Sequence, residues 1–381
     1  MTSSSHPLRQ FLHRVAHELE GDLEGLQNLL SGDRRDDQLR MLAFAGYRND
    51  AELRVRGRMV RSRNLPTPND TTWSKFRAML AIYNSHEVSG VRVRCEAEGQ
   101  IAETMSDEEG YFSFAVPLDK PLPQSTTWEA VRLATPGHVM QAPSIVVPVL
   151  APGRDNHWGI ISDIDDTVIE TGTVDFLKNW RRILAERPED RIAVPGASDL
   201  YRVIARDHVA PTRPFFYVSS SPWSLYEFLT EFMELNRIPH GPMFLKDLGI
   251  DATKLIDSGH EKHKIQAIRT ILEFYPGHKF LLMGDNGQKD VEIYSEAVRA
   301  FPDRVGAVFI RDVTQFCASG AKAELLAQIS AAGVQTYCAP DFAGAVSVLE
   351  TLGVERPVEA TKAAGQDADS GGSIVKLAPS L

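Results

Sequence analysis

Two hydrophobic patterns follow one another in the N-terminal part of the chain. Between residues 8 and 30, apolar side chains recur at helical spacing, which predicts an amphipathic helix within a segment spanning 1–39. From 40 to 152, apolar and polar residues alternate instead, as they do in half-buried strands. The clearest alternating runs are 52–60, 91–95 and 111–116. We therefore predict an antiparallel β-sandwich in this segment, with the arginines of the first run on its solvent-facing side.

Short, continuous apolar runs replace this alternation from 153 to 355. Runs of this kind are typical of strands buried on both faces of a parallel sheet. The strand candidates are 158–162, 215–218, 279–283, 305–310 and 333–337, and the helix candidates are 225–235, 264–274 and 342–352. Their alternation predicts an α/β fold with a doubly wound parallel sheet. The tail at 356–381, which is rich in Ala and Gly, is expected to be disordered.

Composition narrows the classes of function. The net charge of −10 leaves no basic footprint for a general nucleic-acid binder. No run of about 18 apolar residues occurs, so a transmembrane helix is not expected, and the first residues lack the pattern of a signal peptide. The three cysteines, Cys95, Cys317 and Cys338, show no metal-ligand spacing and are expected to be reduced. We therefore expect a cytoplasmic protein, with membranes reached only from their surface.

The sequence Asp-Ile-Asp-Asp-Thr at 163–167 directly follows the first strand candidate of the α/β region. Ligands of an open α/β sheet lie outside the carboxyl ends of its strands, so these side chains are expected in that crevice. Asp163 and Asp165 can divide the hydrolysis of a phosphomonoester, one attacking phosphorus and the other protonating the leaving oxygen. Thr167 can fix the turn by a hydrogen bond. Helix capping is the structural alternative, whereas an EF-hand loop is excluded because its sixth and twelfth positions are valines.

A second acidic turn, at 284–290, follows the strand candidate 279–283. Mg²⁺ takes one or two carboxylates together with substrate oxygens and water. Asp285 leaves the strand directly and is therefore a candidate ligand. Asp290 can bind the ion, bind it through water, or orient Lys264. A solvated acidic turn is the alternative to this predicted Mg²⁺ site.

Two further residues can bind a phosphate group. Ser219 ends the strand candidate 215–218 and can donate a hydrogen bond to a phosphate oxygen, and the adjacent Ser220 can take the same role. Lys264 begins a helical run and brings a point charge, with Lys262 as the competing assignment. Neither signal is specific alone. The order of the four stretches along the chain predicts a phosphate-handling active site.

Together these stretches resemble the haloacid-dehalogenase-like hydrolase superfamily. Its four motifs match Asp163/Asp165/Thr167, Ser219, Lys264 and Asp285/Asp290. The second aspartate is typical of the phosphatases of that superfamily. More narrowly, the segments 162–168, 217–223, 241–246 and 284–294 resemble the actin-patch-type phosphatidate phosphatases and their bacterial relatives. Ser220 departs from the pattern, since many relatives have asparagine there.

The resemblance covers about half of the chain, roughly 155–340, and implies a Rossmann-like catalytic domain at 153–355 with the β-sandwich at 40–152 as an accessory domain. It implies a Mg²⁺-dependent phosphatase that converts phosphatidate, a phosphorylated lipid, to diacylglycerol. Asp163 would be the nucleophile and Asp165 the acid/base, and an aspartyl-phosphate would form. Asp163, the Asp165 backbone carbonyl and Asp285 would bind the metal.

Three questions stay open from the sequence. The substrate could be another phosphomonoester or a phosphoprotein, and the chain could be a non-catalytic protein that binds partners. The segments between the motifs are too short for a large cap domain, which favours an open site for a bulky substrate. An approach for acyl chains could then be lined by Trp223, Trp180, Phe176 and Leu177, or these could be core or interface residues.

Overall fold

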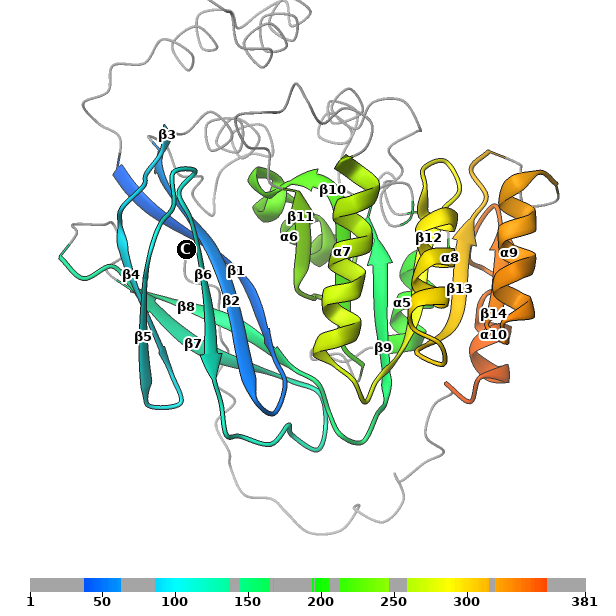
Figure 1. Ribbon diagram of the computed structural model, residues 1–381, viewed down its shortest axis with the longest axis horizontal. Helices are drawn as coiled ribbons and strands as arrows, with labels where there is room; N and C mark the ends of the chain where they lie inside the picture. The colour runs from blue at the N-terminus through cyan, green and yellow to red at the C-terminus, as the bar shows by residue number, and fades with distance from the viewer. Residues whose placement is uncertain are drawn as a thin grey trace, which may run out of the picture.

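The computed structural model describes residues 38–62, 86–137, 144–164, 167, 194, 196–205, 213–246, 259–314 and 319–354 (Figure 1). The predicted helix at 8–30 and the tail at 356–381 lie outside the described residues. Two β-sheets organise the part of the chain that is described, a curled sheet A and a parallel sheet B. No helix within these residues is long and apolar enough to cross a membrane.

Sheet A contains eight strands from the region of alternating hydrophobicity. They are β1 (Gln38–Arg48), β2 (Glu52–Ser62), β3 (His86–Glu87), β4 (Arg92–Ala97), β5 (Gln100–Met105), β6 (Tyr111–Pro117), β7 (Thr127–Ala134) and β8 (Ser144–Ala151). Their order is β3-β2-β1-β8-β7-β4-β5, with β6 also paired to β2. The inward residues of β1, β2, β4, β6, β7 and β8 fill the interior with one apolar cluster, which includes Val55, Val93 and Leu133.

The predicted β-sandwich is therefore wrong in its topology. The strands form one hydrogen-bonded sheet, nearly closed like a barrel, rather than two separate sheets. A short parallel pairing of β1 with β8, at Gly46 and Val149, joins the strands β3-β2-β1 to the strands β8-β7-β4-β5. Alternation along a strand shows which of its faces is buried, but it does not show which strand edges pair.

Sheet B contains six strands, all parallel, in the order β11-β10-β9-β12-β13-β14. They are β9 (Trp158–Asp163), β10 (Phe215–Pro222), β11 (Met243–Lys246), β12 (Lys279–Asp285), β13 (Val305–Arg311) and β14 (Gln335–Ala339). The order reverses between β9 and β12, as in doubly wound sheets, where the ligand crevice lies at that point. The predicted parallel α/β sheet is confirmed, and β11 is a strand that the apolar pattern did not reveal.

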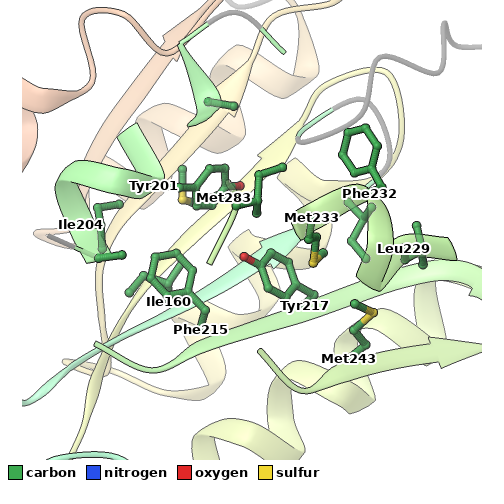
Figure 2. Close-up of a cluster of buried hydrophobic side chains, with 14 of the residues drawn as sticks. Ile160, Tyr201, Ile204, Phe215, Tyr217, Leu229, Phe232, Met233, Met243 and Met283 are labelled. Carbon is green, nitrogen blue, oxygen red and sulfur yellow. The ribbon is translucent and has the colours of Figure 1, made fainter. Parts of the chain in front are cut away.

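Helices cover both faces of sheet B. They are α5 (Ala197–Ala205), α6 (Tyr226–Leu235), α7 (Gly259–Phe274), α8 (Asp290–Ala300), α9 (Ala321–Ala331) and α10 (Val346–Thr351), with a 3₁₀ turn, η2 (Trp223–Leu225), before α6. One core joins α5, α6 and α10 to the sheet, and Figure 2 shows Tyr201, Leu229 and Met243 within it. A second core joins α7, α8 and α9 to the opposite face. Burial on both faces explains why these strands lack polar alternation.

The outward face of β2 is only partly exposed to solvent, whereas the prediction placed its arginines on the solvent-facing side. Arg54 and Arg56 lie on this face and reach residues of the elements around sheet B. The Arg54 guanidinium lies 4.6 Å from the ring centre of Phe274, and that of Arg56 lies 5.3 Å from the ring centre of Trp223. Arginine stacks readily on aromatic rings, so these residues join the two sheets.

The cysteines only partly follow the sequence expectation. Cys95 is a free, buried thiol in β4, and burial raises its pKa to about 11, which makes it unreactive. Cys338 in β14 is disulfide-bonded, so the expectation of reduced thiols is wrong for this residue. Cys317 lies outside the described residues.

Candidate active site

Three strands of sheet B deliver polar side chains to the same edge. β9 ends at Asp163, its neighbour β12 ends at Asp285, and β10 carries Ser219 near its carboxyl end. β9 and β12 flank the point where the strand order reverses, so both carboxylates face the expected ligand crevice. With Asp290 they form a buried group whose carboxylate oxygens lie within 4.8 Å of one another.

Asp290 holds the acidic turn in place from the start of α8. Its Oδ2 accepts a hydrogen bond from the backbone N–H of Asp285 at 3.2 Å. Gly284 allows this approach, because a Cβ there would lie 2.5 Å from Asp290 Oδ2 and 2.7 Å from the Tyr294 hydroxyl. A carboxylate in the first turn of a helix also interacts favourably with the helix dipole.

Lys264 is the buried cation at the centre of the site. Its Nζ lies 2.9 Å from Asp163 Oδ1 and 2.7 Å from Asp290 Oδ1. Burial opposes the charge on this lysine, but the carboxylates of Asp163 and Asp290 outweigh it and raise its pKa above the usual range. α7 begins at Gly259, so Lys264 lies in the second turn rather than at the helix start as predicted. Lys262 is exposed.

The charge in this group favours a divalent cation. Three buried carboxylates face the single ammonium of Lys264. Burial and the nearby charge of Asp290 raise the pKa of Asp285 to about 7, and Lys264 offsets only part of that rise. Asp285 Oδ1 accepts hydrogen bonds from the backbone of Gly287 (2.5 Å) and Gln288 (3.1 Å), whereas its buried Oδ2 has no hydrogen-bond partner among the described residues. Mg²⁺ binds such an oxygen well, so the donor set fits that ion.

The structure describes only some of the other predicted site residues, which are Ser219, Ser220, Thr167 and Asp165. The Ser219 Oγ accepts a hydrogen bond from the backbone N–H of Ser221 at 2.9 Å, which fixes this turn. The buried hydroxyls of Ser220 and Thr167 have no partner within the part of the chain described, so the hydrogen bond expected from Thr167 is not found there. Asp165 lies outside the described residues.

Asn286 is a site residue to which the sequence analysis gave no role. Its Oδ1 accepts the backbone N–H groups of Val313 (2.9 Å) and Thr314 (3.3 Å), and its Nδ2 donates to Asp312 Oδ1 at 2.5 Å. Asn286 thereby ties the turn after β12 to the loop after β13. The sequence analysis selected the turn at 284–290 for its carboxylates. The presence of an asparagine inside that turn was the one feature of the sequence that could have pointed to Asn286.

Lys322 and Tyr201 support the site from two helices. The Lys322 ammonium of α9 donates to the backbone carbonyls of Asn286 and Gln288, the latter at 2.7 Å. The Tyr201 hydroxyl of α5 lies 2.6 Å from Ser162 Oγ, next to Asp163. Both come from helices that the hydrophobic pattern did not reveal, so no sequence signal linked them to the site.

We expect Asn286→Ala to raise the Mg²⁺ concentration needed for half-maximal thermal stabilisation by about tenfold, because residues that orient metal ligands typically contribute this much. Isothermal calorimetry would check the same shift. Asn156→Ala is the matched control, since Asn156 accepts the backbone N–H of Trp158 at the opposite end of β9. Equal Mg²⁺ responses in the two variants would contradict a role for Asn286.

Comparison with known proteins finds similar sequences for this part of the chain. Residues 158–312 match the family model of the catalytic domain of phosphatidate phosphatase APP1. Phosphatidate phosphatase APP1 of Saccharomyces cerevisiae is 33% identical over 153 residues, which are 40% of this chain and 25% of the yeast protein. An uncharacterized protein of Schizosaccharomyces pombe is 31% identical over 219 residues, 55% of this chain and 34% of that protein. The chain thus spans about a third or less of these relatives.

A solved structure gives no further guide. A carbohydrate acetylesterase from Xanthomonas citri is 12% identical, covers 71% of this chain and 68% of its own, and has a TM-score of 0.26, too low to support an argument. The match to the family model is informative, because it covers β9 to β13 and hence Asp163, Ser219, Lys264 and Asp285. The segment 158–312 of this chain is therefore similar to the catalytic domains of APP1-type phosphatidate phosphatases.

Proposed function

We propose that this protein is a Mg²⁺-dependent phosphatase that hydrolyses phosphatidate to diacylglycerol and phosphate. The observation that carries the proposal is the position of Lys264 between Asp163 and Asp290, beside Asp285, at the switch point of sheet B. Phosphoryl transfer depends on positioned charges around the phosphate group, and this cluster supplies them. The match of 158–312 to phosphatidate phosphatase catalytic domains supports the lipid substrate.

Asp163 and Asp285 would hold the Mg²⁺, together with the backbone carbonyl of Asp165. Bound Mg²⁺ would neutralise charge on the phosphate oxygens. Asp290 accepts hydrogen bonds from Lys264 and from the Asp285 backbone, and in this proposal it keeps both in position. Lys264 then orients Asp163 and presents its charge to the substrate.

The reaction proceeds in two displacements in this proposal. The Asp163 carboxylate forms an oxygen–phosphorus bond while the bond from phosphorus to the diacylglycerol oxygen breaks, and Asp165 gives its proton to that oxygen. A water molecule then forms a new bond to phosphorus, its proton passes to Asp165, and Asp163 is released with free phosphate. Ser219 or Ser220 donates a hydrogen bond to a non-bridging phosphate oxygen throughout. The buried hydroxyl of Ser220, which has no hydrogen-bond partner among the described residues, supports its part in this role.

The substrate is tested by phosphate release from phosphatidate in detergent micelles, with Mg²⁺ or with EDTA. We expect release that needs Mg²⁺ and whose rate increases with the mole fraction of phosphatidate in the micelle surface. A soluble aryl phosphate and a phosphopeptide, at equal concentration, are the comparison substrates. Faster turnover of either one would keep the chemistry and overturn the lipid assignment. No turnover of any of the three would support a non-catalytic protein.

A further inference from the structure

β1 of sheet A contacts the elements of sheet B through two aromatic side chains, Phe44 and Tyr47. Its register with β2 shifts between Phe44 and Tyr47. In a regular strand, residues three apart point to opposite faces, but the bulge turns both rings toward sheet B. Phe44 joins the core on the α6 side, whereas Tyr47 packs against the core on the α7 side.

Gly46 makes this bulge possible. A Cβ at this position would lie 2.7 Å from the Arg54 backbone oxygen and 2.7 Å from Val55 Cγ2. Any side chain would therefore force β1 away from β2. The contacts of Phe44 and Tyr47 with the two cores thus both depend on the bulge in β1.

Several contacts from β1 and β2 converge on residues 223–227, which form η2 and the first turn of α6. The ring of Phe44 stacks on that of Trp223, with centroids 4.1 Å apart and planes at 23°, and the Arg56 guanidinium also lies over Trp223. The Ala45 N–H donates a hydrogen bond to the Tyr226 hydroxyl at 2.8 Å. Arg40 forms an ion pair with Glu227 at 2.5 Å. Phe44 is only 2% exposed and Trp223 only 5%. Trp223 is therefore an interface residue, and an approach for acyl chains along its ring is not supported.

The segment held in this way continues directly from the turn that carries Ser219. β10 loses its regular register with β11 between Val218 and Pro222, so the intervening serines are not held by a continuous ladder. Trp223 follows this irregular stretch immediately. The irregular stretch is anchored by the regular part of β10 on one side and by Trp223 on the other. The position of Trp223 therefore helps to determine where the hydroxyls of Ser219 and Ser220 lie.

We propose that Phe44 is a positioning residue for the active site: by holding Trp223, it sets the serine turn at 219–221. Sheet A is then part of the catalytic unit rather than a separable accessory domain. The family match begins at residue 158, so neither Phe44 nor its strand belongs to the matched segment. The kinetic consequence rests on the proposed function, but the effect on the turn itself does not.

The test compares Phe44→Leu with Phe114→Leu in the full chain. Phe114 is a matched control, because it is buried inside sheet A (6% exposed) and belongs to a cluster that does not include Trp223. Hydrogen exchange is measured on peptides covering 215–226 and 279–300, without substrate. We expect Phe44→Leu to speed exchange in the first peptide about tenfold and to leave the second unchanged, because local opening reports local contacts. Phe114→Leu should change neither.

The kinetic measurement uses an aryl phosphate with Mg²⁺, at a temperature well below the unfolding of either variant. We expect Phe44→Leu to lower kcat about tenfold or more, since small misplacements of substrate-binding groups have effects of this size. Phe44→Tyr, which keeps the ring, should restore kcat to within about twofold of wild type. Phe114→Leu should retain the wild-type value.

Two results would overturn the proposal: unchanged exchange at 215–226 in Phe44→Leu, or the same change in Phe114→Leu. If Phe44→Leu does not fold, Tyr226→Phe removes only the hydroxyl that accepts the Ala45 N–H and is measured in the same way. Absence of turnover in the wild type would count against the proposed function alone, because the exchange experiment needs no substrate.

Discussion

Asp163→Asn is expected to lower kcat for phosphate release by about four orders of magnitude or more, as is typical when a nucleophile is removed. The amide has nearly the shape of the carboxylate but cannot attack phosphorus. It also loses the charge that faces the Lys264 ammonium at 2.9 Å. The measurement is single-turnover phosphate release from phosphatidate at saturating Mg²⁺.

Stability should not explain this loss. The substitution removes one of three buried carboxylates, so repulsion within the cluster falls, and we expect a thermal unfolding midpoint equal to or above that of wild type without Mg²⁺. Asp155→Asn is the control, because Asp155 is exposed, bonds to Ser125 and lies before β9 at the opposite end of the strand. More than a tenth of wild-type activity in Asp163→Asn would exclude Asp163 as the nucleophile.

The second large effect is expected from Lys264→Met. Removing one partner of a buried ion pair leaves the other charge uncompensated, and here two carboxylates lose their shared cation. We expect the free energy of unfolding without Mg²⁺ to fall by about 3–5 kcal/mol. We also expect kcat to fall about 10²- to 10³-fold, the usual effect of losing one preorganised charge or donor at a transition state. Urea unfolding and steady-state kinetics measure the two effects.

Measuring the stability and kcat of Lys264→Met with and without Mg²⁺ distinguishes the structural role of Lys264 from its catalytic role. A divalent cation can replace the missing positive charge, so Mg²⁺ should stabilise Lys264→Met more than wild type, while kcat stays low. Lys262→Met is the matched control, since this lysine is exposed and lies two residues earlier on α7. Similar kinetics for the Lys262 and Lys264 variants would remove the basis for assigning the charge to Lys264.

The hydrophobic pattern predicted most of sheet B, and its omissions have local causes. Buried strands such as β9 and β12 are continuous apolar runs, and their periodicity identifies them without tertiary information. β11 has only four residues, the last of them Lys246, which is too short a run to stand out. α8 begins at Asp290, inside the turn that was interpreted for its carboxylates alone.

Some residues of the candidate site were predicted from the sequence, and others were found only in the structure. The aspartates, Ser219 and Lys264 were predicted because phosphate chemistry needs these residue types and because strand ends are recognisable. The sequence favoured Lys264 but left Lys262 as the competing assignment, and the structure places both on α7. The choice follows from the fold, in which the side chain of Lys264 points to β9 and that of Lys262 to solvent. Asn286 and Lys322 act through backbone groups, which leave no pattern along the chain.

The sequence by itself determined the α/β class, the parallel strands and the chemical character of the site, because periodicity and residue type are local properties. Tertiary structure alone decided that β1 pairs with β8, that the arginines of β2 lie over Phe274 and Trp223, and that Phe44 stacks on Trp223. Each of these depends on which surfaces meet, and a strand's alternation is the same whether its outer face meets water or another domain.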